Sequence, residues 1–224
     1  MFPTKIGNGL VRAGQLVFAV IGIVALSYWA SVSVNARLFQ REEAHRFAQE
    51  LQTKAVYEKK DARPESTTKV EQPAPVEGAV IAKLSVSRLG ISTMVVEGVE
   101  YGDLKLAVGH IPGTALPGEP GNVGIAGHRN TFFRPLRLIH KDDVIALTTL
   151  HGEDHYRVVS TKIVGPDDVQ VLYPTSRDSL TLVTCYPFFY VGSAPKRFIV
   201  RAERFSMRGR TATKERFFLP NSVQ

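Results

Sequence analysis

No charged residue occurs between Ala13 and Ala36, and this segment constrains the amino-terminal part of the chain most strongly. Its apolar centre is Leu16–Leu26, and Tyr28 and Trp29 follow where an interfacial aromatic belt would lie. A helix of about 20 residues spans a bilayer, so the segment predicts a retained membrane anchor. Two alternatives stay open: a cleaved signal peptide, with small residues at 30–33 as a cleavage site, and a buried core helix.

The charges that flank this segment do not decide its orientation. Lys5 and Arg12 precede it, whereas Arg37, Arg41 and Arg46 follow it. The positive-inside rule compares the basic residues on the two sides, and here both sides are basic. The orientation therefore has to come from the chemistry of the domain that follows.

The net charge of +7 lies mainly at the two ends of the chain. Residues 1–36 carry +2 and residues 204–224 carry +4, whereas residues 37–78 sum to 0 and residues 79–203 to +1. A nearly neutral domain argues against a nucleic-acid groove across the fold. A basic carboxyl-terminal tail is better suited to anionic lipid or wall polymer.

Changes in composition divide the chain into four segments. Residues 1–36 form the amino-terminal tail and anchor. Residues 37–78 begin with good helix formers and a ragged apolar stripe, which predicts a solvated stalk helix, and then become a proline-containing linker. Residues 79–205 form the folded domain, and residues 206–224 form the basic tail.

From residue 79 the apolar residues alternate with polar ones at a period of two, as in half-buried strands. A short helix is expected at residues 101–107 and an ordered loop at 111–122, and residues 151–154 carry a hairpin signal. An all-β barrel or sandwich follows from this pattern. The expected strands are Val80–Val86, Ile91–Val96, Val123–Gly127, Val144–Leu150, His155–Val164, Leu180–Cys185 and Phe198–Ala202.

Cys185 is the only cysteine of the chain, and it ends the apolar and β-branched run that begins at Thr181. A single cysteine has no partner for an internal disulfide. One interpretation is a small buried core residue, which free cysteines often are. The other is a nucleophile at the rim of the sheet.

His128 and Arg197 also lie at strand ends and would supply the partners of a reactive thiol. His128 follows the strand Val123–Gly127, and Arg197 opens the last strand. A nearby histidine or arginine favours the thiolate or assists proton transfer, and a fixed guanidinium can hydrogen-bond a developing oxyanion. Strand alternation lets Arg197 project on the same side as Cys185 if their strands pair. Arg201 is the alternative arginine, for which we expect a surface ion pair.

The other polar residues suggest structural roles. His110 lies in a predicted loop, where we expect a structural hydrogen bond. No pair of histidines or carboxylates has the spacing of a metal site. The sequence therefore predicts neither a metal nor another cofactor.

Taken together, these motifs resemble the sortases, the membrane-anchored cysteine transpeptidases of bacteria. Thr181–Cys185 reads TLVTC and matches the family's TLxTC motif, with His128 before it and Arg197 on the next strand. The segments 113–122 and 127–136 look like those of class D sortases and their close relatives. The resemblance covers about residues 79–203.

The resemblance implies a closed β-barrel of about eight strands, one more than the sequence pattern shows, and we expect the missing strand within residues 101–117. It also implies cleavage of an LPxTG-like sorting signal after threonine. Cys185 would form a thioacyl intermediate, His128 would transfer protons, and Arg197 would hold the substrate and the oxyanion. Val169 and Leu172, in the loop before the nucleophile strand, and Thr184 would contact the sorting motif. The alternative for residues 169–173 is an ordinary connecting loop.

The resemblance further implies two partners and a location. The partners are a secreted protein that bears a sorting signal and an amine acceptor on a wall precursor or protein. The chain would cross the cell membrane once through residues 13–36, with the catalytic domain outside the cytoplasm. Two other functions stay open: a Cys/His peptidase that uses water as acceptor, and a non-catalytic membrane-tethered module in which Cys185 is buried and far from His128.

Overall fold

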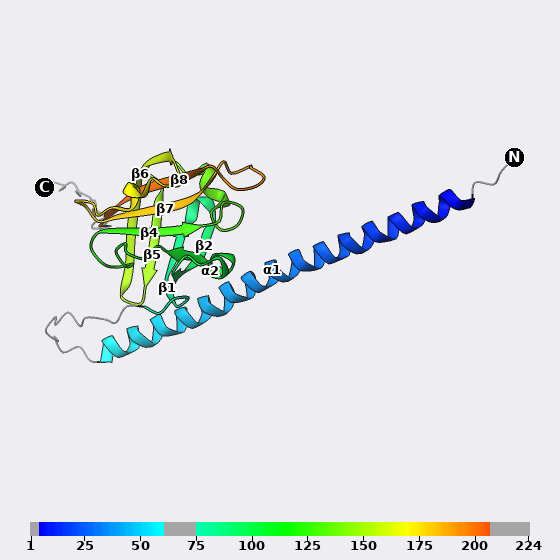
Figure 1. Ribbon diagram of the computed structural model, residues 1–224. Coiled ribbons are helices and arrows are strands. Elements are labelled where there is room, and N and C mark those ends of the chain that lie inside the picture. The colour runs from blue at the N-terminus through cyan, green and yellow to red at the C-terminus, as the bar shows by residue number, and fades with distance from the viewer. Residues whose placement is uncertain (1–4, 61–74, 207–224) are drawn as a thin grey trace, which may run out of the picture.

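The computed structural model describes residues 5–60 and 75–206 and combines one long helix with a closed β-barrel (Figure 1). The helix, α1, runs from Lys5 to Lys60. The described strands are β1 (Val80–Val86), β2 (Ile91–Glu97), β3 (Val108–His110), β4 (Asn122–Gly127), β5 (Val144–Thr149), β6 (Gly152–Val164), β7 (Ser179–Tyr186) and β8 (Lys196–Phe205). The shorter helical elements are α2 (Tyr101–Leu106) and the 3-10 helices η1 (Ser87–Leu89), η2 (Arg134–Leu138) and η3 (Val169–Leu172).

The eight described strands close in the order β1-β2-β3-β4-β7-β8-β6-β5, so the barrel of about eight strands is confirmed. The pairs β2/β3 and β4/β7 are parallel and the other pairs are antiparallel. The strand missing from the sequence pattern is β3, which has only three residues and falls within the expected range 101–117. Strand β6 begins at Gly152, so the hairpin turn is shorter than the signal at 151–154 suggests.

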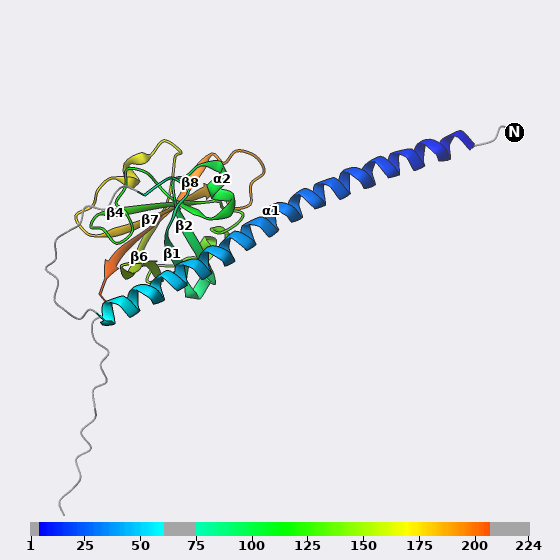
Figure 2. The same ribbon diagram turned by 90° about the horizontal axis from the view of Figure 1, so that it is seen from below.

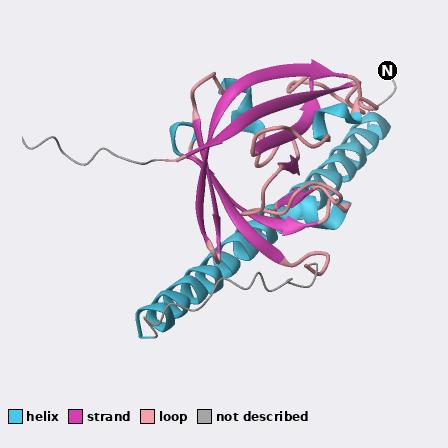
Figure 3. Ribbon diagram, turned by 90° about the vertical axis from the view of Figure 1, so that its left-hand side faces the viewer, coloured by secondary structure: helices cyan, strands magenta, loops and turns pink. Residues whose placement is uncertain are grey.

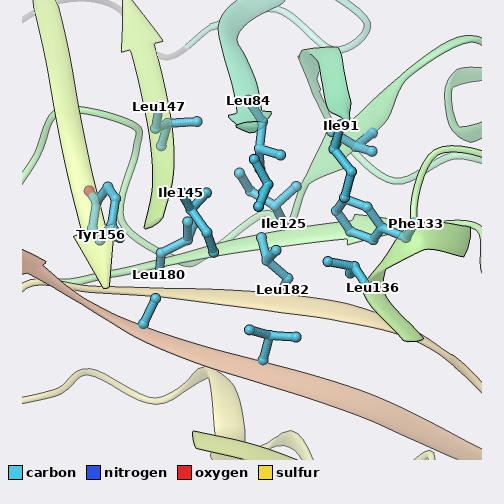
Figure 4. Packing of buried hydrophobic residues seen from close by; sticks show 14 of the residues in the cluster. Leu84, Ile91, Ile125, Phe133, Leu136, Ile145, Leu147, Tyr156, Leu180 and Leu182 are labelled. Carbon is cyan, nitrogen blue, oxygen red and sulfur yellow. The ribbon is translucent and has the colours of Figure 1, made fainter. Parts of the chain in front are cut away.

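Alternating side chains of the strands fill the barrel interior (Figure 4). Leu180 and Leu182 of β7 and Ile125 of β4 are fully buried, and Phe133 and Leu136 after β4 join the same cluster. Burying one such side chain stabilises the fold by about 1.5–3 kcal/mol. On the outward face of β7, Cys185 is partly exposed, whereas Ser179 and Thr181 are buried.

Helix α1 lies along the outside of the barrel and contacts it through its carboxyl-terminal half (Figure 3). The side chain of Gln40 donates to the Leu106 carbonyl at 2.8 Å and accepts from the Met94 N–H at 2.8 Å. Phe47 is only 5% exposed, and Lys54 Nζ lies 2.9 Å from Nδ1 of His151. The expectation of a solvated stalk helix is therefore wrong for the face that carries Gln40 and Phe47, where one amide and one aromatic ring dock the helix.

The amino-terminal half of α1 extends beyond the barrel (Figure 2). By length and composition this helix could cross a membrane: its most apolar window of 18 residues has a mean hydropathy of 2.1, and none of that window is buried. Its apolar side chains, such as Phe18 and Trp29, are exposed to solvent. An exposed apolar surface of this size needs a partner.

Candidate active site

The strand register brings Cys185, His128 and Arg197 to one end of three adjacent strands. In the parallel pair β4/β7, Gly127 lies opposite Thr184, so His128 and Cys185 each come one residue after this pair. In the antiparallel pair β7/β8, Cys185 lies directly opposite Arg197. Because β7 lies between β4 and β8, the cysteine lies between the strand that precedes His128 and the strand that carries Arg197.

Cys185 projects from the outer face of the barrel and is partly exposed. Leu180, Leu182 and Thr184 of the same strand are buried, as expected for positions that alternate with Cys185. The hypothesis of a non-catalytic module requires a buried Cys185 that is far from His128. The partly exposed Cys185, on the strand beside the one that leads to His128, is the opposite of this arrangement. A partly exposed thiol at a strand end is accessible to an extended peptide.

Thr184 connects the two strand ends from inside the barrel wall. Its side chain is 2% exposed, and its hydroxyl donates to the Gly127 carbonyl at 2.7 Å. This geometry revises the expectation that Thr184 contacts a sorting motif, because the hydroxyl points away from the outer face. We instead assign Thr184 to positioning His128 beside Cys185.

Gly127 allows the turn after β4 to fold back against the strand. A Cβ atom at this position would lie 2.7 Å from Cδ2 of Phe133, whose ring is fully buried. The backbone N–H of Phe133 donates to the His128 carbonyl at 3.2 Å, which closes the turn. The glycine therefore allows the Phe133 ring to support the backbone that carries His128.

His128 is partly buried, and its imidazole lies against α2. The ring of Tyr101 packs edge-on with its centroid 6.2 Å from that of His128, and Lys105 Nζ lies 4.2 Å from the centroid of the Tyr101 ring. Burial lowers the pKa of His128 below its ordinary value, and the positive charge of Lys105 lowers it further. The site thus favours a neutral imidazole, which can act as a base.

The Arg197 guanidinium is oriented by two backbone carbonyls that shortly precede it in the chain. Its Nη1 donates to the carbonyls of Ala194 and Lys196, each at 3.1 Å. A guanidinium has five N–H donors, so Nε and Nη2 carry three more beyond those of Nη1. A fixed cation with such donors can bind a carbonyl oxygen that gains negative charge.

Arg129 was not identified as a site residue from the sequence, although it follows His128 directly. Its Nη1 donates to the Pro187 carbonyl at 3.0 Å, and its Nη2 donates to the carbonyls of Tyr190 and Gly192 at 2.8 and 3.1 Å. The residue beside the histidine therefore holds the loop that follows the cysteine.

The 3-10 helix η3 carries Val169 and Leu172, the two residues expected to contact a sorting motif. Val169 is 54% exposed, and Leu172 lies over β4, where a Cβ atom on Gly124 would be 3.2 Å from its Cδ2. Buried Asn122 donates to the carbonyls of Val171 and Tyr173. The loop that contains η3 is therefore held against the outer face of the barrel. The strands beneath it are β4, which leads to His128, and β7, which carries Cys185.

Arg201 has a different role from the expected surface ion pair. Its Nη2 donates to the Val171 carbonyl at 2.6 Å and its Nη1 to Oγ of Ser179 at 3.3 Å. Burial lowers the pKa of this guanidinium. The side chain lies on the same face as Arg197, four residues further along β8, and supports η3 there.

A groove of about 710 Å³ lies beside this loop, over the outer faces of β6 and β8. Its lining includes Lys162, Ile199 and Arg201, but not Cys185, His128 or Arg197. The groove is thus separate from the three strand ends, and we do not assign the chemistry to it.

His110 is structural, as expected, although it lies in β3 rather than in a loop. It is 2% exposed, and its Nδ1 lies 2.8 Å from Oε2 of Glu97. Its Nε2 lies 3.0 Å from both the Ala115 carbonyl oxygen and Oγ1 of Thr114. Among the described residues, no group of three or more His, Cys, Asp or Glu side chains comes together as metal ligands would.

Residues 84–205, more than half of the chain, match the family model described as the Sortase domain. The chain belongs to the sortase family. Sortase D of Bacillus subtilis is 37% identical over 131 residues, which are 58% of this chain and 66% of the relative. Sortase SrtE1 of Streptomyces coelicolor is 31% identical over 156 residues, which are 61% of this chain and 44% of the relative. These matches thus span between 44% and 66% of the two relatives' lengths.

Solved structures of sortases share the fold of this sortase. A Sortase D5 transpeptidase of Clostridium perfringens superposes with a TM-score of 0.61 at 28% identity, over 78% of this chain and 99% of that one. Sortase A of Listeria monocytogenes gives a TM-score of 0.53 at 28% identity, over 57% of this chain and 88% of that one. These similarities agree with the resemblance to class D enzymes and with the barrel topology.

Proposed function

We propose that this sortase is a membrane-anchored cysteine transpeptidase that cleaves an LPxTG-like sorting signal after threonine. The observation that carries the proposal is the register of β4, β7 and β8, which places Cys185 directly opposite Arg197 and one residue beyond the Gly127/Thr184 pair. A thiol, an imidazole and a guanidinium at one barrel end are the groups that acyl transfer requires.

In the first half-reaction, His128 takes the proton of the Cys185 thiol, and the sulfur attacks the threonine carbonyl carbon to form a C–S bond. The carbonyl oxygen becomes an oxyanion, which the Arg197 guanidinium stabilises. The peptide C–N bond then breaks, and His128 gives a proton to the leaving amine. The products are a thioester on Cys185 and the free carboxyl-terminal peptide.

In the second half-reaction, an acceptor amine attacks the thioester carbon. His128 removes the proton from this amine, and Arg197 again stabilises the oxyanion. The C–S bond breaks, His128 returns the proton to the leaving sulfur and so regenerates the thiol, and a new amide joins the acyl group to the acceptor. A neutral imidazole is the form that takes the amine proton, in line with the lowered pKa of His128.

The sorting motif would lie beside η3, on the outer faces of the ends of β4 and β7. Leu172 and the exposed Val169 offer apolar contacts at one end of this surface, and Cys185 lies at the other. Asn122 and Arg201 hold the backbone of η3 and so position these contacts. This arrangement supports an extended peptide that runs from η3 towards the thiol.

Residues 13–36 would hold the enzyme in the cell membrane, with the barrel outside the cytoplasm. The exposed apolar surface of α1 supports this anchor. The partners would be a secreted protein with a sorting signal and an amine on a wall precursor or protein. Extracytoplasmic orientation follows from the chemistry, because these substrates are outside the cell.

Intact-mass analysis tests the reaction with wild type and Cys185→Ala after incubation with LPxTG and LPxTA peptides. Wild type should gain the mass of the fragment that ends at threonine, minus one water, and the alanine variant should gain nothing. With triglycine added, a ligated peptide supports transpeptidation, whereas hydrolysis alone indicates a peptidase. If the wild type forms no adduct with any motif, the proposal is wrong.

Arg197→Lys tests the oxyanion role, because lysine keeps the charge and loses the guanidinium fork. We expect kcat to fall by about a hundredfold, with the thermal unfolding of the barrel little changed. Arg204→Lys, on the same strand, is the matched control and should retain activity. An Arg197→Lys enzyme with wild-type kcat would exclude this role.

A further inference from the structure

The contact between α1 and the barrel fixes the distance between the barrel and the uncharged residues 13–36. Gln40 bonds the barrel backbone at Met94 and Leu106, only four residues after Ala36. An α-helix rises 1.5 Å per residue, so the two positions are about 6 Å apart along the axis. The headgroup region of one leaflet has a similar thickness. If residues 13–36 span the bilayer, the barrel therefore lies against its surface.

The barrel end with the candidate active site faces this surface. In Figures 1 and 2 the loop between β7 and β8, residues 187–195, projects on the side towards which the amino-terminal half of α1 extends. This loop joins the end of β7 to the start of β8, so Cys185 and Arg197 lie at the same end. His128 belongs to this end as well, because β4 runs parallel to β7.

The tip of this loop exposes three consecutive apolar or aromatic residues. Phe189 is 78% exposed, Tyr190 is 47% exposed and Val191 is 99% exposed. A run of large apolar side chains in solvent marks an interaction surface. Aromatic residues are enriched where proteins meet the headgroup region of a membrane.

Two segments at the active-site end are basic, and we call them the basic border. Residues 128–140, after β4, and residues 186–197, around the loop between β7 and β8, contain five basic residues and no acidic one: Arg129, Arg134, Arg137, Lys196 and Arg197. Acidic residues at this end lie outside these segments, among them Asp103 in α2, Asp142 and Asp143 before β5, and Asp167 and Asp168 after β6. Arg134, Arg137 and Lys196 are exposed. The Arg137 guanidinium lies 5.7 Å from the centre of the Phe189 ring, so positive charge accompanies the apolar tip. This charge complements anionic lipid headgroups.

We propose that the active-site end of the barrel rests on an anionic membrane surface, with Phe189, Tyr190 and Val191 inserted into the headgroup region. The inference rests on the proposed anchoring by residues 13–36. Two independent observations support it: the short helical distance from Ala36 to Gln40, and the combination of apolar tip and basic border at the same end. A barrel seated in this way presents its thiol at the height at which membrane-bound substrates emerge.

Fluorescence quenching by a nitroxide at headgroup depth tests, with the full chain, whether the active-site end of the barrel contacts the membrane. Because Cys185 is the only cysteine, Cys185→Ala provides a thiol-free background for a single labelled site. Val191→Cys carries an environment-sensitive fluorophore, and Ser176→Cys, near the start of β7 at the opposite end, is the matched control. Both proteins are reconstituted into vesicles of equal parts phosphatidylcholine and phosphatidylglycerol that contain a headgroup-level nitroxide quencher.

We expect the Val191 probe to be quenched about threefold more than the Ser176 probe, as for a side chain at the interface. Equal quenching of the two probes, in protein that floats with the vesicles, overturns the seating and leaves the anchor intact. Protein that does not float overturns the anchor and the seating together. Wild-type activity on soluble peptide in detergent reports separately on the proposed reaction.

Charge reversal and a competing ligand complete the test. Arg134→Glu with Arg137→Glu should reduce quenching of the Val191 probe about threefold in anionic vesicles, and unchanged quenching excludes the basic border from the contact. If the Val191 probe responds to a sorting peptide in detergent but not to lipid, the loop tip contacts substrate and the proposal is wrong.

Discussion

The hydroxyl of Thr184 donates to the Gly127 carbonyl at 2.7 Å and links the strand end before His128 to the strand end that carries Cys185. The bond lies inside the barrel wall, where Thr184 is 2% exposed. The relative position of His128 and Cys185 is thus set by a buried contact between neighbouring strands.

Thr184→Val should weaken both the fold and the reaction. The variant removes one buried hydrogen bond, and we expect the free energy of unfolding to fall by about 1–2 kcal/mol. We expect kcat/KM to fall about ten- to a hundredfold, because small displacements of reacting groups are costly. Thr184→Ser keeps the hydroxyl and should retain most activity. Denaturant unfolding and peptide-cleavage kinetics measure the two effects; wild-type kcat/KM in the valine variant would contradict this role.

Gly127→Ala should displace the turn that carries His128. The new Cβ atom would lie 2.7 Å from the buried Phe133 ring, and overpacking of this kind costs about 1–3 kcal/mol. Phe133→Leu in the same chain should relieve part of the clash, so the two changes should be non-additive in a double-mutant cycle. Thermal and denaturant unfolding of the wild type, the two single variants and the double variant provide the test. Strictly additive changes in the free energy of unfolding would count against a direct contact between residue 127 and the Phe133 ring.

Arg129→Gln should release the loop that follows the cysteine. Arg129 bonds three loop carbonyls, so amide exchange at residues 188–193 should accelerate and kcat/KM should fall about tenfold. Arg129→Lys should restore only part of the protection, because an ammonium lacks the planar fork. Arg134→Gln is the matched control. Unchanged exchange in Arg129→Gln would show that the loop is held by other contacts.

The strands that carry the candidate site could be predicted because two apolar runs lead to His128 and Cys185 and a third begins after Arg197. Their pairing could not be derived from periodicity, since the parallel register of β4 and β7 joins segments separated by more than 50 residues. The resemblance to sortases supplied the missing arrangement. The three-residue strand β3 was too short for an alternating pattern to reveal it.

The supporting residues escaped sequence reasoning because their partners are distant backbone groups. Arg129, Asn122 and Arg201 all donate to loop carbonyls, and a sequence pattern carries no signal for such a contact. The docking of α1 was missed for a related reason. It depends on the amide of Gln40 and one buried ring, Phe47, rather than on a continuous apolar stripe.

Tyr156→Phe should leave the barrel as stable as the wild type or more stable by about 1 kcal/mol. Among buried side-chain atoms of the described residues, the Tyr156 hydroxyl is the one without a hydrogen-bond partner. Burial, aided by the charge of Asp154, raises the pKa of this phenol to about 12. Denaturant unfolding measures stability, and ultraviolet titration should lose one late-ionising tyrosine in the variant. A clear loss of stability would reveal a partner for the hydroxyl, such as a buried water.

Lys105→Met should raise the pKa of His128. Burial lowers this pKa first and the Lys105 charge lowers it further, because a nearby cation disfavours the imidazolium. Removing the cation should therefore move the pKa upwards, while burial keeps it below the ordinary value. NMR titration of the His128 ring in Cys185→Ala protein measures the shift without interference from a thiolate, and Lys162→Met is the matched control. High salt should reduce the difference in the His128 pKa between the Cys185→Ala protein with and without Lys105→Met. A lower His128 pKa in Lys105→Met would contradict the electrostatic assignment.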